Sequence, residues 1–281
     1  MIDGLVVVDK PVGWTSHDVV ARCRKVFGQK RVGHSGTLDP GATGVLLVGL
    51  GRVTRLLRFL NDLPKSYVGE VVLGVETSTL DADGDVVATH DMGPVVLDDA
   101  AAAAQSLTGE ILQVPPMVSA VKVGGRRLHQ LARRGEEVER AARPVTVHRF
   151  EVAPGPEPGV LAIEVDCSSG TYVRTLAADM GRALGGGAHL RHLRRTAIGS
   201  FVLAEAVALD ELGAAHVLAP AAALRDHPSV TVDAVAADDV AHGRPLDVEA
   251  PASGPYAVLD ADGRLLAVYE GRRPVVVVAA Q

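Results

Sequence analysis

The sequence predicts an α+β fold with a small all-β domain at its C-terminal end. Strand-like and helix-like segments follow one another without the regular alternation that is typical of a doubly wound sheet. After Pro220 the pattern changes to short β-rich pieces separated by turn residues, ending in the run VVVVAA. A length of 281 residues also exceeds the usual size of one domain. We therefore expect a large domain over residues 1–225 and a small one over 226–281.

The first sixty residues predict two strands and two helices around one loop. The predicted elements are a buried strand from Gly4 to Asp9, a helix capped by Ser16, a strand from Gly44 to Leu50 and a helix through Leu60. Residues 28–43 are too rich in glycine, proline and polar side chains for either element. This segment is predicted to be a loop.

The middle of the chain predicts hairpins and strands interrupted by helices. In order, these are a strand Lys65–Gly74, a hairpin or meander through Val87, a helix Leu97–Leu107, a hairpin Val121–Leu128, a short basic helix up to Arg134, strands Val145–Val152 and Val160–Cys167, a helix Tyr172–Leu184, and two short strands or a bend around Gly199. The basic segment, about residues 120–150, is predicted to be an insertion.

Composition bounds the class of protein. The two cysteines, Cys23 and Cys167, lie far apart with no metal-ligand spacing, which argues against a disulfide scaffold and a structural zinc site. The first residues lack a basic region, and no apolar run reaches the roughly 18 to 20 residues of a membrane span. We expect a cytoplasmic protein without a membrane segment.

Charge is strongly segregated along the chain. The net charge of −6 alone would count against a nucleic-acid partner. However, Val19–Leu38 carries five basic residues and no acid, and Lys122–Arg149 carries eight basic residues against three acids. Either run could be a solvated face. Because basic residues gather in more than one such run, we take the runs as candidate contacts to the phosphates of a nucleic acid.

The segment from Gly33 to Gly44 is the densest motif. It holds four glycines together with His34 and Asp39, which suggests close approach of the backbone to a ligand. It has neither the Gly-Lys-Ser/Thr of a P-loop nor the order of a dinucleotide site. Alone, Asp39-Pro40-Gly41 would be an ordinary turn.

Several motifs together resemble the bacterial tRNA pseudouridine-55 synthase family. In order, these motifs are DKPxGWTSH from Asp9, the Gly33–Gly44 loop, Lys65-Ser66-Tyr67, LGxxTxTxD ending at Asp81, PPxxSAxK ending at Lys122, and CSxGTYVRT from Cys167 to Thr175. The resemblance covers roughly residues 4–204. It implies a mixed, largely antiparallel sheet flanked by helices, with a PUA-like domain at the C-terminus.

The resemblance also implies roles for individual residues. Asp39 matches the nucleophile, and Arg174 matches the arginine that pairs with it and favours its ionised form. Tyr67 matches the catalytic-site tyrosine, whose ring can stack on an extruded base. On a half-buried strand, core packing would be the ordinary role of Tyr67.

Further residues match substrate-binding positions. They are His34, associated with extruding bases from the T-loop, Tyr172 and Leu193 at the target base, Lys65, and Asp81. The basic insertion matches the family segment that closes over the T-arm. His129 stands where the family pattern has a tyrosine, which removes one stacking or packing contact.

The implied activity is isomerisation of the T-loop uridine at position 55 of tRNA, with an accessory role in tRNA folding. The resemblance implies no metal or organic cofactor, no obligatory protein partner and a monomer. Two other functions remain open: a non-catalytic RNA-binding protein, and a subunit of a guide-RNA ribonucleoprotein, which usually has a more basic C-terminal domain. A metal-dependent nuclease lacks a compact cluster of ligands in the sequence.

Overall fold

The computed structural model divides the chain into two compact units. Unit 1 comprises Met1–Leu63 and Ala197–Gln281, and unit 2 comprises Pro64–Thr196. The structure describes residues 1–119, 122–123, 126–127, 136, 138–248, 251 and 253–278. No helix among these residues is long and apolar enough to cross a membrane.

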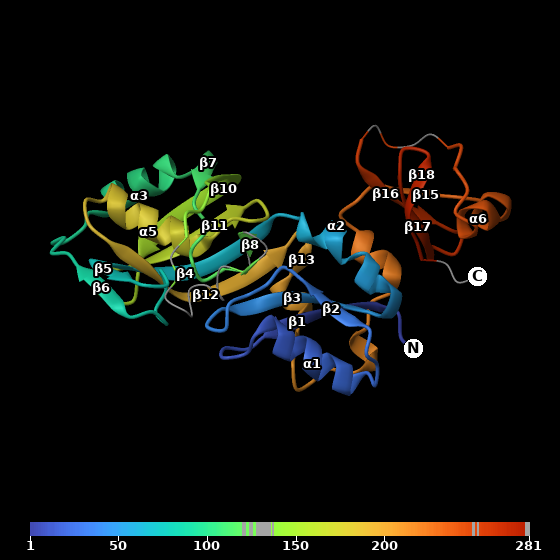
Figure 1. Cartoon of the computed structure of the whole chain (residues 1–281), viewed down its shortest axis with the longest axis horizontal. Coiled ribbons are helices and arrows are strands. Elements are labelled where there is room, and N and C mark those ends of the chain that lie inside the picture. Colours follow the sequence, from blue (N-terminus) through green and yellow to red (C-terminus); the bar gives the residue numbers. More distant parts are fainter. Residues whose placement is uncertain are drawn as a thin grey trace. The chain divides into compact units, whose positions relative to one another are not determined.

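Unit 1 begins with a sheet (Figure 1). Its two central strands are buried on both faces. Its strands are β1 (Gly4–Lys10), β2 (Val32–Ser35), β3 (Thr43–Leu50), β13 (Phe201–Val202) and β14 (Val207–Ala208). β1 pairs antiparallel with β3 from Gly4 opposite Leu50 to Lys10 opposite Gly44. Alternate residues of both strands enter two different cores, which is why each strand contains an unbroken apolar run, Leu5–Val8 in β1 and Val45–Val48 in β3.

Helix α1 (Ser16–Val26) covers one of those cores with Val19, Val20 and Cys23. The helix is capped by Thr15, because the Thr15 side chain accepts from the backbone N–H of Asp18 and the Asp18 carboxylate accepts from that of Thr15. The prediction that Ser16 caps this helix is therefore wrong by one residue.

Two further predictions for unit 1 need correction. Residues 28–43 are not all loop, since β2 pairs antiparallel with β3. The predicted helix through Leu60 is broken into a 3₁₀ turn η1 (Gly51–Arg55) and a short helix α2 (Leu57–Asn61). The break falls at Leu56, which caps the end of η1 and directly precedes α2.

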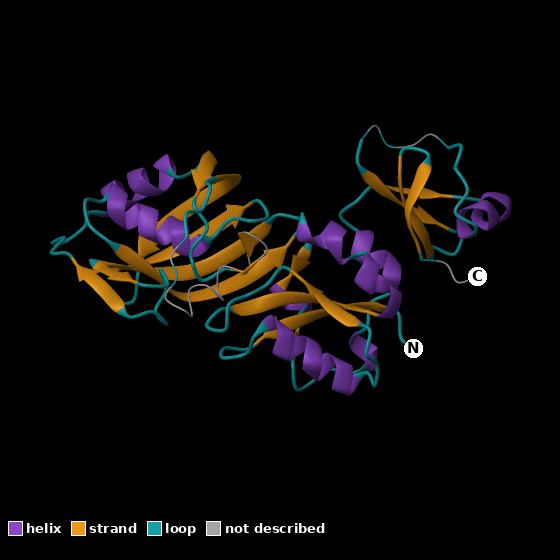
Figure 2. Cartoon of the chain, in the orientation of Figure 1, coloured by secondary structure: helices purple, strands orange, loops and turns teal. Residues whose placement is uncertain are grey.

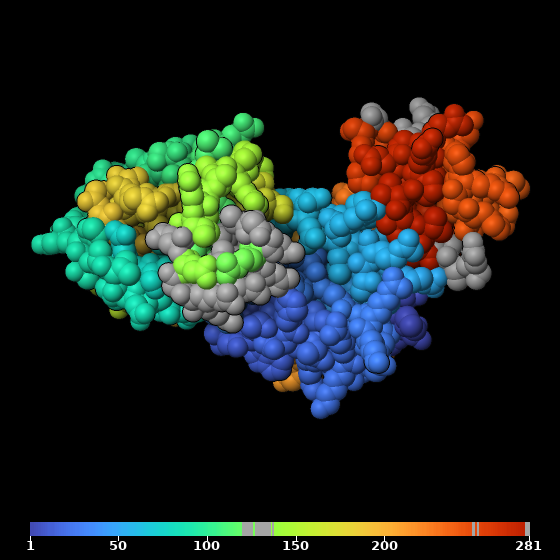
Figure 3. All heavy atoms as spheres, in the orientation of Figure 1, coloured from blue at the N-terminus to red at the C-terminus, as the bar shows by residue number. Residues whose placement is uncertain are grey.

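The C-terminal part of unit 1 is a four-stranded sheet in the order β15-β16-β17-β18. Its elements are β15 (Ser229–Thr231), α6 (Ala234–Ala241), β16 (Pro255–Leu259), β17 (Leu265–Glu270) and β18 (Arg273–Val277). The predicted small β domain is confirmed, with helix α6 as an addition. The space-filling view shows the described residues of this region packed into one body (Figure 3).

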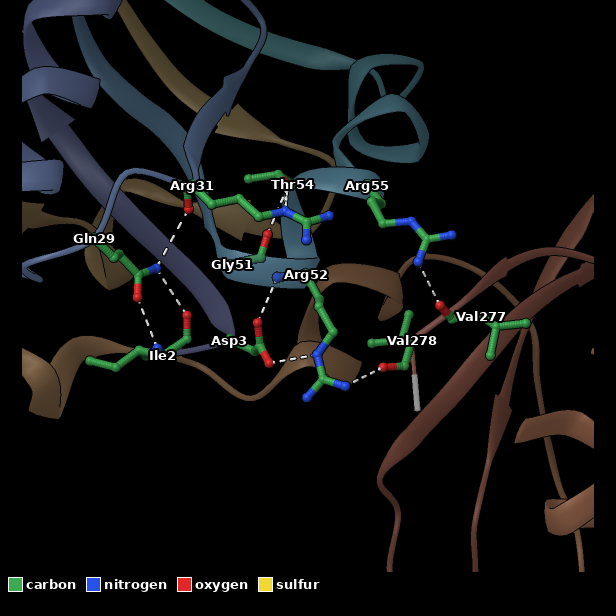
Figure 4. Close-up of polar contacts among 10 residues, drawn as sticks. All are labelled: Ile2, Asp3, Gln29, Arg31, Gly51, Arg52, Thr54, Arg55, Val277 and Val278. Carbon is green, nitrogen blue, oxygen red and sulfur yellow. Dashed lines mark hydrogen bonds and ion pairs between the residues drawn. The ribbon is translucent and has the colours of Figure 1, made fainter. Parts of the chain in front are cut away.

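Arginines of η1 contact the end of this small sheet (Figure 4). Arg52 donates to the Asp3 carboxylate at 2.7 Å and to the Val278 carbonyl at 2.9 Å, and Arg55 donates to the Val277 carbonyl at 2.8 Å. The bonds to Val277 and Val278 use backbone carbonyls at the end of β18, so they do not depend on the side chains there.

Unit 2 is built on an antiparallel run of strands, in the order β12-β4-β11-β10-β7 (Figure 2). Its strands are β4 (Lys65–Leu73), β5 (Val75–Thr77), β6 (Val86–Thr89), β7 (Gly109–Gln113), β8 (Lys122–Val123), β9 (Arg126–Arg127), β10 (Arg143–Pro154), β11 (Val160–Cys167) and β12 (Ala188–Ile198). β5 with β6 and β8 with β9 form the two predicted hairpins.

Helices α3 (Leu97–Ser106) and α5 (Val173–Ala183) cover one face of this sheet, called here the inner face. Their Ala103, Leu176 and Met180 pack with Val71 and Ile163 in a single core. The mixed sheet flanked by helices is thus confirmed. The predicted basic helix up to Arg134 and the position of His129 lie outside the described residues.

Candidate active site

The loop that carries Asp39 is held by the residues on either side of it. Before Asp39, the backbone N–H of Leu38 donates to the buried Ser16 hydroxyl at 2.9 Å, and that hydroxyl donates to the Leu38 carbonyl at 3.2 Å. After it, the Pro40 carbonyl accepts from the backbone N–H of Gly13 at 2.9 Å. The half-buried Asp39 therefore lies on a backbone that is fixed from two sides.

The side chain of Lys10 also holds the Asp39 loop, through hydrogen bonds to backbone carbonyls. Its ammonium group is fully buried and donates to the carbonyls of Trp14 at 2.6 Å, Pro11 at 3.0 Å and Pro40 at 3.3 Å. A buried cation is stable only where such acceptors surround it. Lys10 in the DKP motif thus links the two glycine-containing loops of unit 1.

His34 lies on β2 beside the same loop. Its ring is 5.3 Å from that of His17, in an edge-to-face arrangement. Next to it, the Ser35 hydroxyl and the Gly36 N–H both bond to the Asn61 side chain, at 2.8 and 3.1 Å. The turn after His34 is therefore anchored to α2, while the ring itself is half-buried.

In unit 2, Arg174 is almost fully buried at the start of α5. Its guanidinium donates to the carbonyls of Thr79 at 3.0 Å and Val118 at 2.7 Å, and lies 3.2 Å from the Asp81 carboxylate. Arg174 and Asp81 were predicted separately as a catalytic and a substrate-binding residue. The structure brings them together as an ion pair.

Asp81 is itself held in a tight turn. Thr79 donates to the Asp81 carboxylate, the Thr77 hydroxyl donates to the Asp81 carbonyl at 2.6 Å, and the intervening Leu80 has a left-handed φ of 62°. A non-glycine residue seldom adopts that conformation, because it costs free energy that the surrounding contacts must offset. The turn therefore presents both the Asp81 carboxylate and the Thr79 carbonyl to Arg174.

Tyr67 lies on the inner face of β4 and packs against the core of unit 2. Its hydroxyl is hydrogen-bonded to the guanidinium of Arg195 on the neighbouring strand β12. Arg195 is 1% exposed, and burial lowers the pKa of its guanidinium from the ordinary value. Tyr67 thus packs in the core, as expected for a tyrosine on a half-buried strand, and its hydroxyl also bonds to the buried guanidinium of Arg195.

Tyr172 precedes α5, and its backbone is fixed by Gln113. The buried Gln113 amide donates to the Tyr172 carbonyl at 3.1 Å and accepts from its N–H at 2.8 Å. Both main-chain groups of Tyr172 are therefore paired through one side chain of β7. This leaves the half-buried tyrosine ring to make other contacts.

The remaining predicted residues also lie in unit 2. Lys65 is buried at the start of β4, and Leu193 on β12 packs at the edge of the core. Lys65 and Arg195 are close enough to Cys167 to favour its thiolate, but burial outweighs them and raises the pKa of Cys167 to about 11. Cys167 is accordingly a protonated core residue and not a nucleophile.

Three residues that hold parts of the site in place were not predicted from the sequence. They are Lys10, which anchors the Asp39 loop, Gln113, which fixes the backbone of Tyr172, and Arg195, which is the partner of Tyr67. Lys10 lies within the DKPxGWTSH motif, so the sequence could have indicated that it has a role at the site. Gln113 and Arg195 have partners 59 and 128 positions away in the sequence. Nothing local distinguishes them from surface residues.

Within the part of the chain that the structure describes, no group of three or more His, Cys, Asp and Glu residues could hold a metal ion. The acidic turn 81–85 supplies hydrogen bonds to its own backbone instead, as when the Asp81 carboxylate accepts from the Asp83 N–H at 3.2 Å.

Family models match nearly the whole chain. Residues 24–173 match the N-terminal domain of TruB family pseudouridylate synthases, residues 174–229 a tRNA pseudouridylate synthase B C-terminal domain, and residues 227–279 the C-terminal domain of tRNA pseudouridine synthase II. The fold also resembles a solved H/ACA RNP bound to a substrate RNA, with a TM-score of 0.75, 24% identity and coverage of 99% of this chain and 85% of that chain. Fold and models define the class as pseudouridine synthase.

Two curated relatives narrow this class. A protein of Mycobacterium ulcerans named tRNA pseudouridine synthase B is 49% identical over 96% of this chain and 92% of that protein. One of the same name from Symbiobacterium thermophilum is 53% identical over 86% of this chain and 82% of that protein. The chain belongs to the TruB family of pseudouridylate synthases.

Proposed function

We propose that this protein isomerises the T-loop uridine at position 55 of tRNA to pseudouridine. The observation that carries the proposal is membership of the TruB family over almost the full length, with relatives named tRNA pseudouridine synthase B. The intact sequence motif around Asp39 supports it. Product and substrate are isomers, so no external atom or electron is required, in agreement with the expectation of no cofactor.

We propose Asp39 as the nucleophile. The reaction breaks the C1′–N1 bond, turns the uracil and forms a C1′–C5 bond, while C5 loses a proton and N1 gains one. A carboxylate can add covalently to the sugar or the base, or act as a base toward a glycal. The fixed backbone of the Asp39 loop suits any of these, because it holds the carboxylate in one place before the RNA arrives.

Arg174, Tyr67 and Tyr172 are proposed to complete the catalytic residues and the base pocket. Arg174 has the burial and the two carbonyl acceptors of a guanidinium locked in one orientation. That it pairs with Asp39 remains a prediction. Tyr67 and Tyr172 can offer aromatic faces to an extruded base, with Leu193 as an apolar wall.

RNA binding is proposed to use the remaining residues. His34 would act at the T-loop during base extrusion, Lys65 and Asp81 would contribute polar groups near the substrate, and the basic insertion at about 120–150 would contact phosphates of the T-arm. An accessory role in tRNA folding follows from the need to open the tRNA elbow.

We also propose that the protein acts alone, as a cytoplasmic monomer with a catalytic domain over residues 1–225 and a PUA-like domain over 226–281. The family match over residues 227–279 supports that boundary. The H/ACA RNP neighbour keeps the ribonucleoprotein alternative open, but the similarity to relatives named tRNA pseudouridine synthase B is much higher. A requirement for added protein or guide RNA would contradict the stand-alone assignment.

The test incubates the protein with an unmodified T-arm stem-loop, without metal or cofactor, and maps pseudouridine by chemical probing. Asp39→Asn removes the charge at nearly constant volume, and Asp62→Asn, at an exposed carboxylate after α2, is the matched control. Modification at position 55 by wild type and the control, but not by Asp39→Asn, supports reaction and nucleophile together. RNA binding without modification by any variant would favour a non-catalytic binder.

A further inference from the structure

Two consecutive side chains of β12 reach the same carboxylate of β4. The Nε of Arg191 donates to Glu70 Oε2 at 2.7 Å, and Nδ1 of His192 lies 3.0 Å from the same oxygen. In a regular strand, successive side chains point to opposite faces of the sheet. Two neighbouring residues opposite one residue of the partner strand are the pattern of a β-bulge.

The backbone of His192 agrees with a bulge at this point. Its φ is 54°, in the left-handed region, and Leu80 is the only other non-glycine residue with a positive φ in the described part of the chain. The His192 side chain is 73% exposed, so core packing does not hold it there. The contact of its ring with the Glu70 carboxylate stabilises this conformation.

The Glu70 carboxylate is ionised at neutral pH. Burial alone would raise the pKa of Glu70, but hydrogen bonds and charge from Arg191 and His192 outweigh it and lower the pKa below the ordinary value. Arg191 is held in turn by Glu157, at 2.8 Å. The group on the outer face of the sheet is therefore a charged cluster around one carboxylate.

On the inner face, the bulge changes which residues of β12 lie beside β4. A Cβ placed on Gly69 would lie 3.4 Å from Leu193 Cδ1 and 3.6 Å from Leu190 Cδ1. Residues three apart share a face only if an extra residue interrupts the alternation. Gly69 directly precedes Glu70 in β4 and therefore lies on the opposite face of the sheet. Because of the bulge, Leu190 and Leu193 both lie beside Gly69 on the inner face, while Arg191 and His192 both contact Glu70 on the outer face.

Arg195 follows Leu193 by two residues and so shares its face. It is buried and hydrogen-bonded to the Tyr67 hydroxyl, and Tyr67 in turn is two residues before Gly69 on β4. A shift of β12 by one residue would turn Leu193 and Arg195 to the wrong side. Their placement beside Tyr67 depends on the bulge.

We propose that Glu70 is a positioning residue for the reaction. Its carboxylate holds the Arg191–His192 bulge from the outer face of the sheet, and the bulge sets Leu193 and Arg195 beside Tyr67 on the inner face. Glu70 itself points away from the proposed substrate pocket. This inference rests on the proposed function of the same pocket.

The test compares Glu70→Ala with Glu164→Ala in single-turnover pseudouridine formation on the T-arm stem-loop. Glu164 is the matched control, because it lies on the same outer face, pairs with Arg149 at 3.0 Å and faces Val68, not β12. We expect Glu70→Ala to slow the chemical step about tenfold while RNA affinity changes by less than about twofold. Glu164→Ala should keep the wild-type rate.

A second variant separates positioning from a general loss of charge. Glycine adopts a left-handed φ without steric cost, so Glu70→Ala/His192→Gly should recover the rate of the His192→Gly single variant. A double variant as slow as Glu70→Ala, or a Glu70→Ala rate equal to wild type, would overturn the inference. If Glu70→Ala does not fold, Glu70→Gln provides the same comparison at constant volume. Failure of the wild type to modify the RNA would instead contradict the proposed function.

Discussion

The Asp39 loop of unit 1 and the Arg174 region of unit 2 hold their functional side chains by different means. The loop is fixed through main-chain groups: Leu38 bonds to Ser16, and Pro40 to Gly13 and Lys10. Around Arg174 the side chain itself is fixed, by two carbonyls and a carboxylate in a buried environment.

Because of this difference, we expect mutations in the Asp39 loop and mutations around Arg174 to have different effects on rate and stability. A carboxylate on a backbone-anchored loop can be neutralised while the main-chain bonds that fix the loop remain, so its variants report mainly on chemistry. A buried guanidinium is part of its own scaffold, and removing it leaves Asp81 and two carbonyls without their partner. Variants there should change rate and stability together.

The largest expected effect is at Asp39. Asp39→Asn should lower the rate of pseudouridine formation on the order of 10⁴-fold, because the neutral amide can neither add to the substrate nor act as a base. Single-turnover kinetics gives the rate, and a thermal melt within about 2 °C of wild type would show that the loop is intact. A large loss of melting temperature would contradict the backbone-anchored description.

The next effect is at Arg174. Arg174→Lys should lower the rate about 10² to 10³-fold, since an ammonium cannot satisfy Thr79, Val118 and Asp81 in the same planar geometry. It should also lower the free energy of unfolding by roughly 2 kcal/mol. The control is Arg182→Lys on the exposed side of the same helix. Equal kinetics for the two variants would show that Arg174 is only a structural residue.

Lys10 tests the anchoring of the loop. Lys10→Met removes three hydrogen bonds to carbonyls and should reduce the free energy of unfolding by roughly 2–3 kcal/mol, measured by urea denaturation. A smaller loss of rate is expected, because Asp39 remains present on a less fixed backbone. Lys25→Met, at an exposed position of α1, should leave both quantities unchanged.

The smallest effect concerns Asp3 and depends on pH. Burial alone would raise the pKa of Asp3, but hydrogen bonds and charge from Arg52 lower it below the ordinary value of 3.8. The stabilisation by ionised Asp3, about 1 kcal/mol, is therefore complete above that value and is lost as pH falls through the lower folded pKa. The difference in unfolding free energy between wild type and Asp3→Asn should be constant above about pH 5 and shrink toward pH 3. A difference that grows on acidification would have the wrong sign.

The sequence by itself determined the elements whose pattern is local. The apolar runs at 5–8 and 45–48 specify strands buried on both faces, and the alternating run from Lys65 gives a strand with one covered face. It also gave the motifs, because Asp39, Tyr67 and Arg174 stand in recognisable local contexts. Their roles came from resemblance, since a lone aspartate, tyrosine or arginine carries no such information.

Only the tertiary structure decided the features that depend on distant partners. β2 was missed because its glycine and histidine do not alternate in hydrophobicity, and it becomes a strand only by pairing with β3. Asp81 proved to be a partner of Arg174, 93 positions later in the sequence. Glu70 looks like an ordinary surface acid until its contacts to Arg191 and His192 are seen. Local preferences set the strands and helices, but burial and pairing across the sheet fix which charges meet.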